Sequence, residues 1–431
     1  MGTKYKDSGI PWMPSIPDTW EVQRGKNILV LNKRPVRESD EVVTCFRDGE
    51  VILRSERRTD GFTMSDKEIG YQGINKGDIV IHGMDGFAGS MGVSKSTGKG
   101  SPVLVVCSPK YDAVPQFIIY YLRTLAMTNV FVALSTGIRE RSCDLRWNKI
   151  AELQFVLPSA IEQQRIADFL DRKCAEIDEL AALQETMIAE LKRYKQSVVT
   201  EAVTKGLDPD VPMKDSGVEW IGEIPEGWGV AKMNNICSVI TDFVASGSFE
   251  SLRVNVPYLD TPDYAMLVRT ADLSGSTRSS EKVYISEHSY NFLRNSNLFG
   301  GEVVLPNIGA VGDVYIVPQL YKRMSLAPNS IMFKTNGSDK YYYYYFFSRA
   351  GKQSIFDICQ STAQAKFNKT ELRNLRVLLP PLTEQRAIAD YLDKKCAEID
   401  ELIAIKQQKI ESLKEYKKSV IFEYVTGKKE I

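Results

Sequence analysis

One glycine-rich stretch of the chain invites comparison with the loops that bind nucleotide phosphates. It reads GSMGVSKSTGKG from Gly89 to Gly100, whereas a phosphate-binding loop needs glycine, four residues, and then glycine, lysine and a hydroxyl residue. Val93 stands where the first of these glycines belongs, and Gly100 stands where the hydroxyl residue belongs. The pattern fails, so we expect a flexible hairpin or groove-facing loop in which Lys95 and Lys99 can still contact a phosphate group.

Other residues that carry catalysis or bind metals are few and scattered. The chain has two histidines, His82 and His288, and neither has a cysteine or histidine neighbour at the spacing of a metal site. The seven cysteines include no Cys-x-x-Cys pair, which is typical of reduced thiols in a cytosolic protein. The nucleophile motifs of hydrolases and the Asn/Asp-Pro-Pro-aromatic run of amino-methyltransferases are both missing. We therefore expect no active site, no bound metal and no bound cofactor.

Length, composition and charge limit the class of protein. With 431 residues, 43% apolar and 26% charged, the chain is typical of a globular protein with several domains. It has neither an apolar run long enough to span a membrane nor an N-terminal signal peptide, so we expect a cytoplasmic protein. The formal net charge is zero, but basic residues outnumber acidic ones in both residues 21–157 and residues 229–379. This distribution permits contact with a polyanion such as DNA.

Two parts of the sequence are repeated. The octapeptide KCAEIDEL occurs at Lys173–Leu180 and again at Lys395–Leu402, inside a gap-free alignment of Glu162–Thr204 with Glu384–Thr426. A shorter repeat lies upstream, in the KDSG-containing segment before each variable region. Because a fixed-period repeat indicates duplicated structural units, we predict two tandem halves, each made of a lead-in, a variable region and a long helix. The predicted domains are residues 1–157 (lead-in 1–20), 158–212, 213–379 (lead-in 213–228) and 380–431.

Each long repeat has the periodicity of an amphipathic helix. Apolar residues recur at intervals of three and four residues, without an internal proline or glycine, and such a stripe packs against another helix. At 1.5 Å per residue each helix would be about 65 Å long, and the other copy is the obvious partner. Gly206 and Gly427 are placed to end the helices, and Cys174 and Cys396 are expected to be small buried residues. The predicted seam consists of Leu170, Ile177, Leu180, Leu191, Val198, Leu392, Ile399, Leu402, Leu413 and Val420, interrupted by the polar residues Gln184, Lys406 and Lys409.

The repeat also keeps polar residues that a packing seam would leave free to vary. A plain helix pair explains the seam alone. A solvated face has little reason to keep its sequence between two copies, whereas a face that binds the same partner twice does. We therefore predict a partner-docking face at Glu162, Gln163, Asp168, Asp171 and Asp178 and at the corresponding Glu384, Gln385, Asp390, Asp393 and Asp400.

The two variable regions differ in sequence but share an outline. Short β-branched segments alternate with Gly, Asn and Asp, as in INKGDIVIHG and LFGGEVVLPNIGAVG, which predicts short strands and turns. An aromatic stretch, FIIYYLRTL or YYYYYFFSRAG, predicts a buried helix, and a polar loop and a last strand then lead into the long helix. The expected fold is α+β, with two β-rich domains joined by two long helices. Two domains with one architecture and different surfaces should perform the same task on different targets.

The starts of the two long repeats resemble a known family. They read LPSAIEQQRIADFLDRKCAEIDEL and LPPLTEQRAIADYLDKKCAEIDEL, and they are similar to the conserved helical regions of specificity subunits of type I restriction–modification systems. The Leu-Pro, Glu-Gln, Ile-Ala-Asp and Ile-Asp elements occur in this order in both. Ser159 and the extra Gln164 are departures of the first copy. The resemblance covers essentially the whole chain.

This resemblance implies a non-catalytic, DNA-reading subunit of a complex that is a type I site-specific deoxyribonuclease and an adenine-specific DNA methyltransferase. Two target-recognition domains would each read one half of a bipartite, asymmetric site in double-stranded DNA, and an antiparallel coiled coil would set the distance between the half-sites. Two methyltransferase subunits would dock on the repeated helices, and restriction and translocase subunits can join them. S-adenosylmethionine, ATP and Mg would then be bound by the partner subunits and not by this chain.

The family supplies no general set of DNA-contact residues, so the candidates come from the polar loops that close each variable region. Arginine pairs with guanine, and asparagine and glutamine pair with adenine. A structural role at the surface is the alternative for each residue. A protein–protein adaptor, with the helices as a ruler between two β-rich ligand-binding modules, is the alternative function, but it leaves the basic excess of both variable regions unexplained. The candidates are Arg139, Arg141, Arg146 and Lys149 in the first domain and Gln364, Lys366, Asn368 and Lys369 in the second, besides Lys95 and Lys99.

Overall fold

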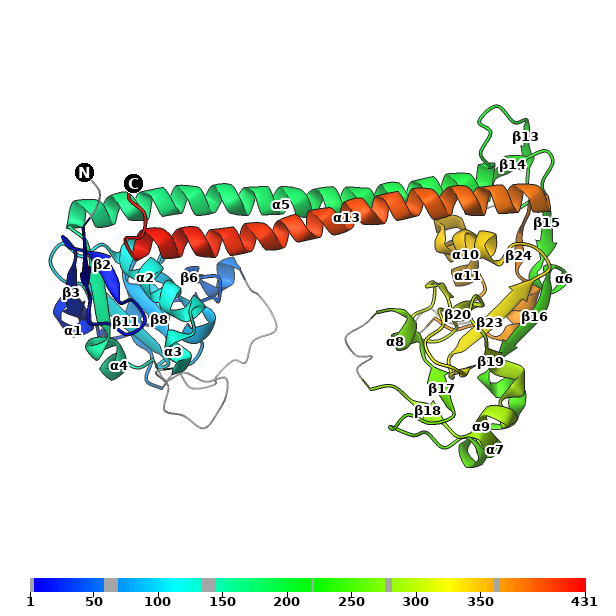
Figure 1. Cartoon of the computed structure of the whole chain (residues 1–431), viewed down its shortest axis with the longest axis horizontal. Coiled ribbons are helices and arrows are strands. Elements are labelled where there is room, and N and C mark those ends of the chain that lie inside the picture. The colour runs from blue at the N-terminus through cyan, green and yellow to red at the C-terminus, as the bar shows by residue number, and fades with distance from the viewer. Residues whose placement is uncertain (1–3, 58–68, 134–144, 219–220, 276–280, 360–364) are drawn as a thin grey trace. The chain divides into compact units, whose positions relative to one another are not determined.

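The computed structural model of the chain describes residues 4–57, 69–133, 145–218, 221–275, 281–359 and 365–431. These residues form two compact units (Figure 1). Unit 1 comprises Met1–Glu185 and Gln407–Ile431, and unit 2 comprises Thr186–Lys406. Each unit therefore contains one variable region, the first part of the helix that follows it and the last part of the other long helix. The domain boundaries expected after residues 157, 212 and 379 stay predictions.

Unit 1 is built around a four-stranded antiparallel sheet with the strand order β4-β11-β8-β9. The helix α2 (Pro115–Met127) packs with this sheet into one core, in which Phe117 and Tyr121 are fully buried. This is the buried aromatic helix predicted from FIIYYLRTL. The strands of the sheet are β4 (Leu29–Leu31), β8 (Ile79–His82), β9 (Met91–Val93) and β11 (Leu104–Pro109), and two further strand pairs are β5 (Val43–Cys45) with β6 (Val51–Leu53) and β7 (Gln72–Ile74) with β10 (Gly98–Gly100).

Unit 2 repeats this sheet and adds a second one. The order β16-β23-β20-β21 matches that of unit 1, and α10 (Asp339–Phe347) takes the place of α2 in the core. The stretch YYYYYFFSRAG forms two helices, not one, because the Ser348 side chain caps a new helix, α11 (Arg349–Asp357). The added sheet, β18-β17-β22-β19, covers a small separate core. The strands are β16 (Cys237–Asp242), β20 (Val303–Pro306), β21 (Tyr315–Ile316) and β23 (Ser330–Thr335), and β17 (Ala265–Val268), β18 (Tyr284–Ile285), β19 (Asn297–Leu298) and β22 (Met324–Leu326).

The last strand of each variable region pairs back to its beginning. In unit 1, β12 (Gln154–Leu157) pairs with β3 (Glu21–Arg24), and in unit 2, β24 (Arg376–Leu379) pairs with β15 (Gly229–Lys232). The start of the long helix therefore lies beside the lead-in. Each lead-in is a hairpin, β1 (Tyr5–Asp7) with β2 (Ser15–Pro17) in unit 1 and β13 (Met213–Asp215) with β14 (Glu223–Pro225) in unit 2.

Short helices and turns connect these strands. The short helices are α1 (Gly25–Ile28), α3 (Val130–Ala133), α4 (Trp147–Glu152), α6 (Met233–Ile236), α7 (Phe249–Asn255), α8 (Thr270–Leu273), α9 (Glu287–Phe292) and α12 (Lys369–Asn374). The 3-10 turns are η1 (Arg54–Glu56), η2 (Gly86–Ala88), η3 (Phe243–Ser246) and η5 (Arg294–Ser296).

The two repeats form the long helices that their periodicity predicts. Helix α5 (Ala160–Lys205) has 46 residues and α13 (Leu382–Val425) has 44. Gly206 and Gly427 follow them with φ angles of +80° and +69°. Glycine tolerates this left-handed conformation, in which helices commonly end.

The long helices pack together in antiparallel orientation (Figure 1). In unit 1, the Phe169 ring packs on Tyr424 with 4.5 Å between ring centroids. Farther along α5, Asp178 pairs with Lys417 at 2.6 Å. Residue numbers thus rise along α5 while they fall along its partner, as in an antiparallel coiled coil.

The seam between the helices uses one predicted heptad position and not the other. Leu170 and Leu392 are fully buried, whereas Leu180 and Leu402 are 45% and 47% exposed, so the prediction is wrong at these two leucines. Alternating steps of four and three residues lead from Leu170 to Cys174, Ile177 and Ile188, which are buried, and Leu180 lies on the opposite flank. Among the other seam candidates, the buried residues are Ile177, Ile399, Val420 and Gln184, the half-buried ones are Leu191, Val198, Leu413 and Lys406, and the exposed one is Lys409. On α13, the buried residues also include Cys396, Ile403 and Ile410.

Candidate nucleic-acid interface

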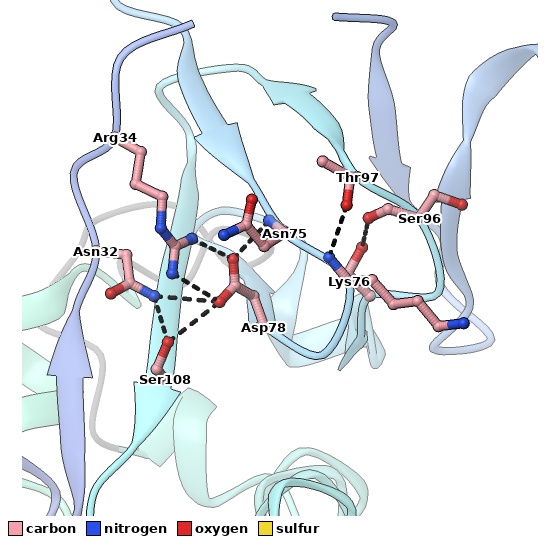
Figure 2. A network of polar contacts seen from close by, with 9 residues as sticks. Asn32, Arg34, Asn75, Lys76, Asp78, Ser96, Thr97 and Ser108 are labelled. Carbon is pink, nitrogen blue, oxygen red and sulfur yellow. Dashed lines mark hydrogen bonds and ion pairs between the residues drawn. The ribbon is translucent and has the colours of Figure 1, made fainter.

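A buried carboxylate stands at the start of the sheet strand β8 in unit 1. Asp78 is 4% exposed and pairs with the guanidinium of Arg34. Figure 2 shows the network around it, in which Asp78 also accepts hydrogen bonds from Asn75 N at 2.7 Å, Ser108 Oγ at 3.1 Å and Asn32 Nδ2 at 3.2 Å. A buried charge is tolerated only when it is paired and hydrogen-bonded. This network therefore fixes the turn that leads into β8.

The corresponding strand of unit 2, β20, starts in the same way. Glu302 is fully buried and accepts hydrogen bonds from Phe299 N at 3.0 Å and Gly300 N at 2.9 Å. Lys334 pairs with it at 3.1 Å. The two acids are the Asp of KGD and the Glu of GGE in the sequence. The variable regions thus share an internal anchor that sequence reasoning missed, although the two short motifs carried its signal.

The loops that follow β8 and β20 lie beside the segments that close each variable region. In unit 1, the Gly83 carbonyl accepts a hydrogen bond from Leu145 N at 2.9 Å. In unit 2, the Asn307 carbonyl accepts one from Phe367 N at 3.2 Å. Leu145 and Phe367 are buried and immediately precede the N-cap residues of the short helices α4 and α12. This hydrogen bond joins the strand loop to the closing segment in each unit. We call the exposed residues within 83–90 and 145–149 of unit 1, and within 307–314 and 365–369 of unit 2, the reading surface of that unit.

The glycine-rich stretch Gly89–Gly100 is not a simple hairpin, because β9 pairs with β8 and β10 pairs with β7. A Cβ added at Gly92 would lie 2.0 Å from the carbonyl oxygen of Gly49. The glycine is required by the close approach of two chain segments, and not by a phosphate. Lys76 N donates to Thr97 Oγ1 at 3.1 Å and joins the neighbouring turns (Figure 2).

The candidate DNA-contact residues of unit 1 occupy different environments. Lys95 is largely exposed and pairs with Glu50 at 2.9 Å, and Lys99 is half-buried in β10. Arg146 and Lys149 are exposed, Arg146 at the N-terminus of α4 and Lys149 within it. These last two belong to the reading surface of unit 1. The remaining candidates, Arg139 and Arg141, lie outside the described residues.

In unit 2, two of the candidates have structural tasks. Asn368 caps α12, and its side chain accepts hydrogen bonds from two backbone amides of that helix. Lys369 is half-buried and pairs with Asp242 at 2.8 Å. Lys366 is exposed and forms a β-bridge with Ile308 in the loop after β20, so it belongs to the reading surface of unit 2. Gln364 lies outside the described residues.

The predicted docking residues Glu162 and Glu384 hold the long helices to the lead-ins. Trp20 Nε1 donates to Glu162 at 3.2 Å, and Trp228 Nε1 donates to Glu384 at 2.7 Å. Both indole rings are buried. The repetition of these acids therefore has a cause inside each unit.

The next predicted pair, Gln163 and Gln385, binds the backbone in front of the core helices. Gln163 Oε1 accepts from Val114 N, and Gln385 Oε1 accepts from Ser338 N, each at 3.0 Å. The amide nitrogen of each glutamine donates at 2.9 Å to a proline carbonyl just before its own helix. Both side chains are buried, so they orient the long helix on its variable region.

Asp171 and Asp393 bind a tyrosine of the core helix in their own unit. Tyr120 Oη donates to Asp171 at 2.7 Å, and Tyr344 Oη donates to Asp393 at 2.8 Å. Burial and the neighbouring carboxylate raise the pKa of both tyrosines, so each hydroxyl remains a proton donor. The ion pair of Asp178 has its counterpart in unit 2, where Asp400 pairs with Lys195 at 2.7 Å. In four of the five predicted docking pairs, both residues thus contact another element of their own unit.

A different set of repeated residues remains exposed on the long helices. Asp168 and Asp390 are exposed, and Asp168 accepts a hydrogen bond only from its neighbour Gln164 among the contacts of the described residues. Large apolar side chains are also exposed at matching positions of the two helices. These are Leu180 and Leu402 (45% and 47%), Leu183 and Ile405 (47% and 55%), and Tyr194 and Tyr416 (51% each). We call these six residues the exposed apolar set.

Within the described ranges, no three His, Cys, Asp or Glu side chains gather where they would hold a metal ion. His82 Nδ1 accepts a hydrogen bond from Asp85 N at 2.9 Å, and burial lowers the pKa of this imidazole. The cysteines in the same ranges are free thiols, and burial raises the pKa of Cys107 to about 12. None of the described helices combines the length and apolarity that a membrane-spanning segment needs.

Comparison with known proteins agrees with this geometry. The family model of the type I restriction modification DNA specificity domain matches residues 225–415. The type I restriction enzyme MjaVIII specificity subunit of Methanocaldococcus jannaschii is 24% identical, over 98% of this chain and 96% of the relative.

Solved structures share the fold. A chain from a structural study of complex assembly and conformational transition in the type I R-M system aligns with a TM-score of 0.70 and 15% identity, over 96% of this chain and 99% of that one. The crystal structure of the HsdS subunit from Thermoanaerobacter tengcongensis aligns with a TM-score of 0.54 and 15% identity, over 96% and 98%. With two β-rich regions, two packed long helices and these relatives, the chain belongs to the family of DNA specificity subunits of type I restriction–modification systems.

Proposed function

We propose that the two variable regions read the two halves of a bipartite, asymmetric DNA site. One observation carries this proposal: the same scaffold is built twice, with the same sheet order, buried acid and closing segment, while the loops on it differ. Two equivalent scaffolds with different loops bind different targets of the same chemical kind. Methylated adenines mapped in DNA treated with the assembled complex should define one interrupted, asymmetric site. A continuous site would contradict the proposal.

The chemistry of the reading surfaces supports contact with DNA. Arg146, Lys149 and Lys366 are exposed on them, and cationic side chains neutralise phosphates while arginine also pairs with guanine. Affinity for a duplex that carries the site should fall linearly with salt on a double-logarithmic plot, with a slope of about −0.9 per neutralised phosphate. Affinity that does not depend on salt would contradict phosphate contact and favour a protein ligand.

The long helices carry, in our proposal, two methyltransferase subunits, one on each unit. Unit 1 holds Leu180, Leu183 and Tyr416 of the exposed apolar set, and unit 2 holds the matching residues. An apolar centre with a charged rim is typical of a protein–protein interface, and Asp168 and Asp390 supply rim charges. S-adenosylmethionine would be bound by these methyltransferases, and ATP and Mg by a restriction and translocase subunit where one joins.

The stoichiometry of the complex tests this docking proposal. Leu180→Asp or Leu402→Asp alone should reduce the bound methyltransferase from two copies to one, and the double variant should bind none, as measured by the mass of the purified complex. Tyr111→Asp is the control, because Tyr111 is 92% exposed and lies outside the long helices. Two retained copies in the double variant would place the docking face elsewhere.

A further inference from the structure

Each reading surface presents one exposed apolar side chain at an equivalent place. Met84 is 57% exposed and Ile308 is 38% exposed. Each directly follows the residue whose carbonyl is hydrogen-bonded to the closing segment, at Leu145 in unit 1 and at Phe367 in unit 2. The two side chains therefore correspond to each other, although their sequence surroundings differ.

Each of these two side chains has a charged neighbour. Next to Met84, Asp85 pairs with Arg47 at 3.3 Å, and the Arg47 side chain is 71% exposed. In unit 2, Ile308 is bridged to Lys366, which is exposed. A protein interface would have to remove water from these charges to reach one apolar side chain. A nucleic acid offers phosphates to the cations and an apolar group to the side chain between them.

The backbone holds both side chains in defined positions. In unit 1, the hydrogen bond from Asp85 N to His82 and the turn η2 fix the loop, and Gly89 closes it with φ +92°. In unit 2, Gly309 and Gly312 have φ angles of +89° and +95°, which side chains with a Cβ rarely adopt. A rigid loop positions a contact group better than a mobile one.

We propose that Met84 and Ile308 each contact the 5-methyl group of a thymine, Met84 in the half-site of unit 1 and Ile308 in the half-site of unit 2. The thymine methyl is the apolar group that the major-groove edge of the base pairs presents. This inference rests on the proposed function, because it requires that the reading surfaces face DNA bases. It assigns to each half-site one A·T pair that is read without a hydrogen bond.

Replacing thymine by uracil tests the contact, since uracil differs from thymine only by this methyl group. The complex with its methyltransferase subunits is assayed for binding to duplexes in which each thymine of the mapped site is replaced in turn. One replacement in each half-site should weaken binding about fourfold, the effect of one apolar carbon removed from a contact. Met84→Ala should abolish this penalty in the first half-site alone, and Ile308→Ala should abolish it in the second alone.

Two matched variants serve as controls. Val30 and Val239 are 43% and 36% exposed on β4 and β16, the strands at the far edges of the same two sheets. Val30→Ala and Val239→Ala should leave both uracil penalties unchanged. Specific binding without a uracil penalty, or with a penalty that survives Met84→Ala and Ile308→Ala, would overturn the inference and leave the proposed function standing. A complex that binds no specific DNA site would overturn both.

Discussion

The junctions between the variable regions and the long helices are alike in the two units, whereas the reading surfaces differ. Trp20 contacts Glu162 as Trp228 contacts Glu384. On the reading surfaces, in contrast, equivalent positions carry different side chains, such as Met84 in unit 1 and Ile308 in unit 2. The residues that are repeated are thus those that attach each variable region to its long helix. This attachment does not involve the loops, which can therefore differ between the two units.

The largest expected effect comes from replacing the second half by a copy of the first. The fragment Met1–Gly206 should form a two-fold dimer, because Lys195 matches Lys417 and would pair with Asp178 of the second copy, and Val199 and Val203 match buried residues of α13. Both reading surfaces would then be the same. Methylation with the partner subunit should change from an asymmetric site to an interrupted palindrome of the first half-site.

The outcome is read by mapping methylated adenines and by measuring the mass of the fragment in solution. The matching fragment that starts at Met213 and ends at Ile431 serves as the second arm and should give a different palindrome. A monomeric fragment, or a dimer that keeps the asymmetric site, would break the equivalence of the two units.

Removal of the buried acids should destabilise one unit at a time. Asp78→Ala leaves Arg34 without its buried partner, and Glu302→Ala does the same to Lys334. Both cations keep contact with water, so the main cost is the loss of the hydrogen bonds to the buried carboxylate, about 1–3 kcal/mol each. Limited proteolysis should show cleavage in unit 1 for the first variant and in unit 2 for the second. Asp48→Ala, which breaks an exposed ion pair, should cost less than about 1 kcal/mol. Equal cleavage of both units in either variant would contradict the separate anchors.

Charge reversal on the long helices should weaken docking without unfolding. Asp168→Lys with Asp390→Lys changes two exposed carboxylates and should lower the affinity for the methyltransferase about tenfold, as expected for rim charges, with an unchanged melting temperature. Glu38→Lys with Asp260→Lys makes the same charge change at exposed positions of the variable regions. Equal affinity of both double variants, measured by titration calorimetry, would exclude Asp168 and Asp390 from the docking face.

The smallest effect is expected from breaking the two equivalent ion pairs between the long helices, Asp178 with Lys417 in unit 1 and Asp400 with Lys195 in unit 2. The carboxylates of Asp178 and Asp400 are 62% and 57% exposed, so each pair should contribute about 0.2–1 kcal/mol. Double-mutant cycles with Asp178→Asn and Lys417→Met, and with Asp400→Asn and Lys195→Met, measure the two coupling energies from chemical unfolding. Coupling energies that differ by more than about 1 kcal/mol would show that the two ends of the coiled coil are not equivalent.

The periodicity of the sequence predicted the long helices and the alternation of short strands, because both patterns depend on neighbours within a few residues. It did not predict which flank of the helix faces its partner. Leu180 fits a spacing of three from Ile177 as well as any seam residue does, and the small Cys174 gives no strong apolar signal. The choice between the two flanks depends on how closely the helices approach.

The candidate site was predictable only in part for a related reason. The partner of Glu162 is Trp20, and the partner of Asp171 is Tyr120, and no spacing rule joins residues so far apart in the chain. The repetition of these acids therefore led to the prediction that they bind the same partner protein twice. The roles of Asn368 as a helix cap and Lys369 as an ion-pair partner likewise depend on contacts that only the fold creates.

The division of the chain into units has a consequence for the order in which a ribosome can complete them. Unit 2 is one continuous segment, Thr186–Lys406, whereas unit 1 requires Gln407–Ile431, whose Val420, Ile421 and Val425 join its core. Although its variable region is synthesised first, unit 1 cannot complete its core until about 240 residues beyond Glu185 have been added. This takes on the order of 10–50 seconds of translation. During this time the apolar stripe around Leu170 has no helix to cover it. The half of the protein that is made first is thus the half that is finished last, and a nascent chain that stalls in this interval leaves an apolar stripe exposed to water.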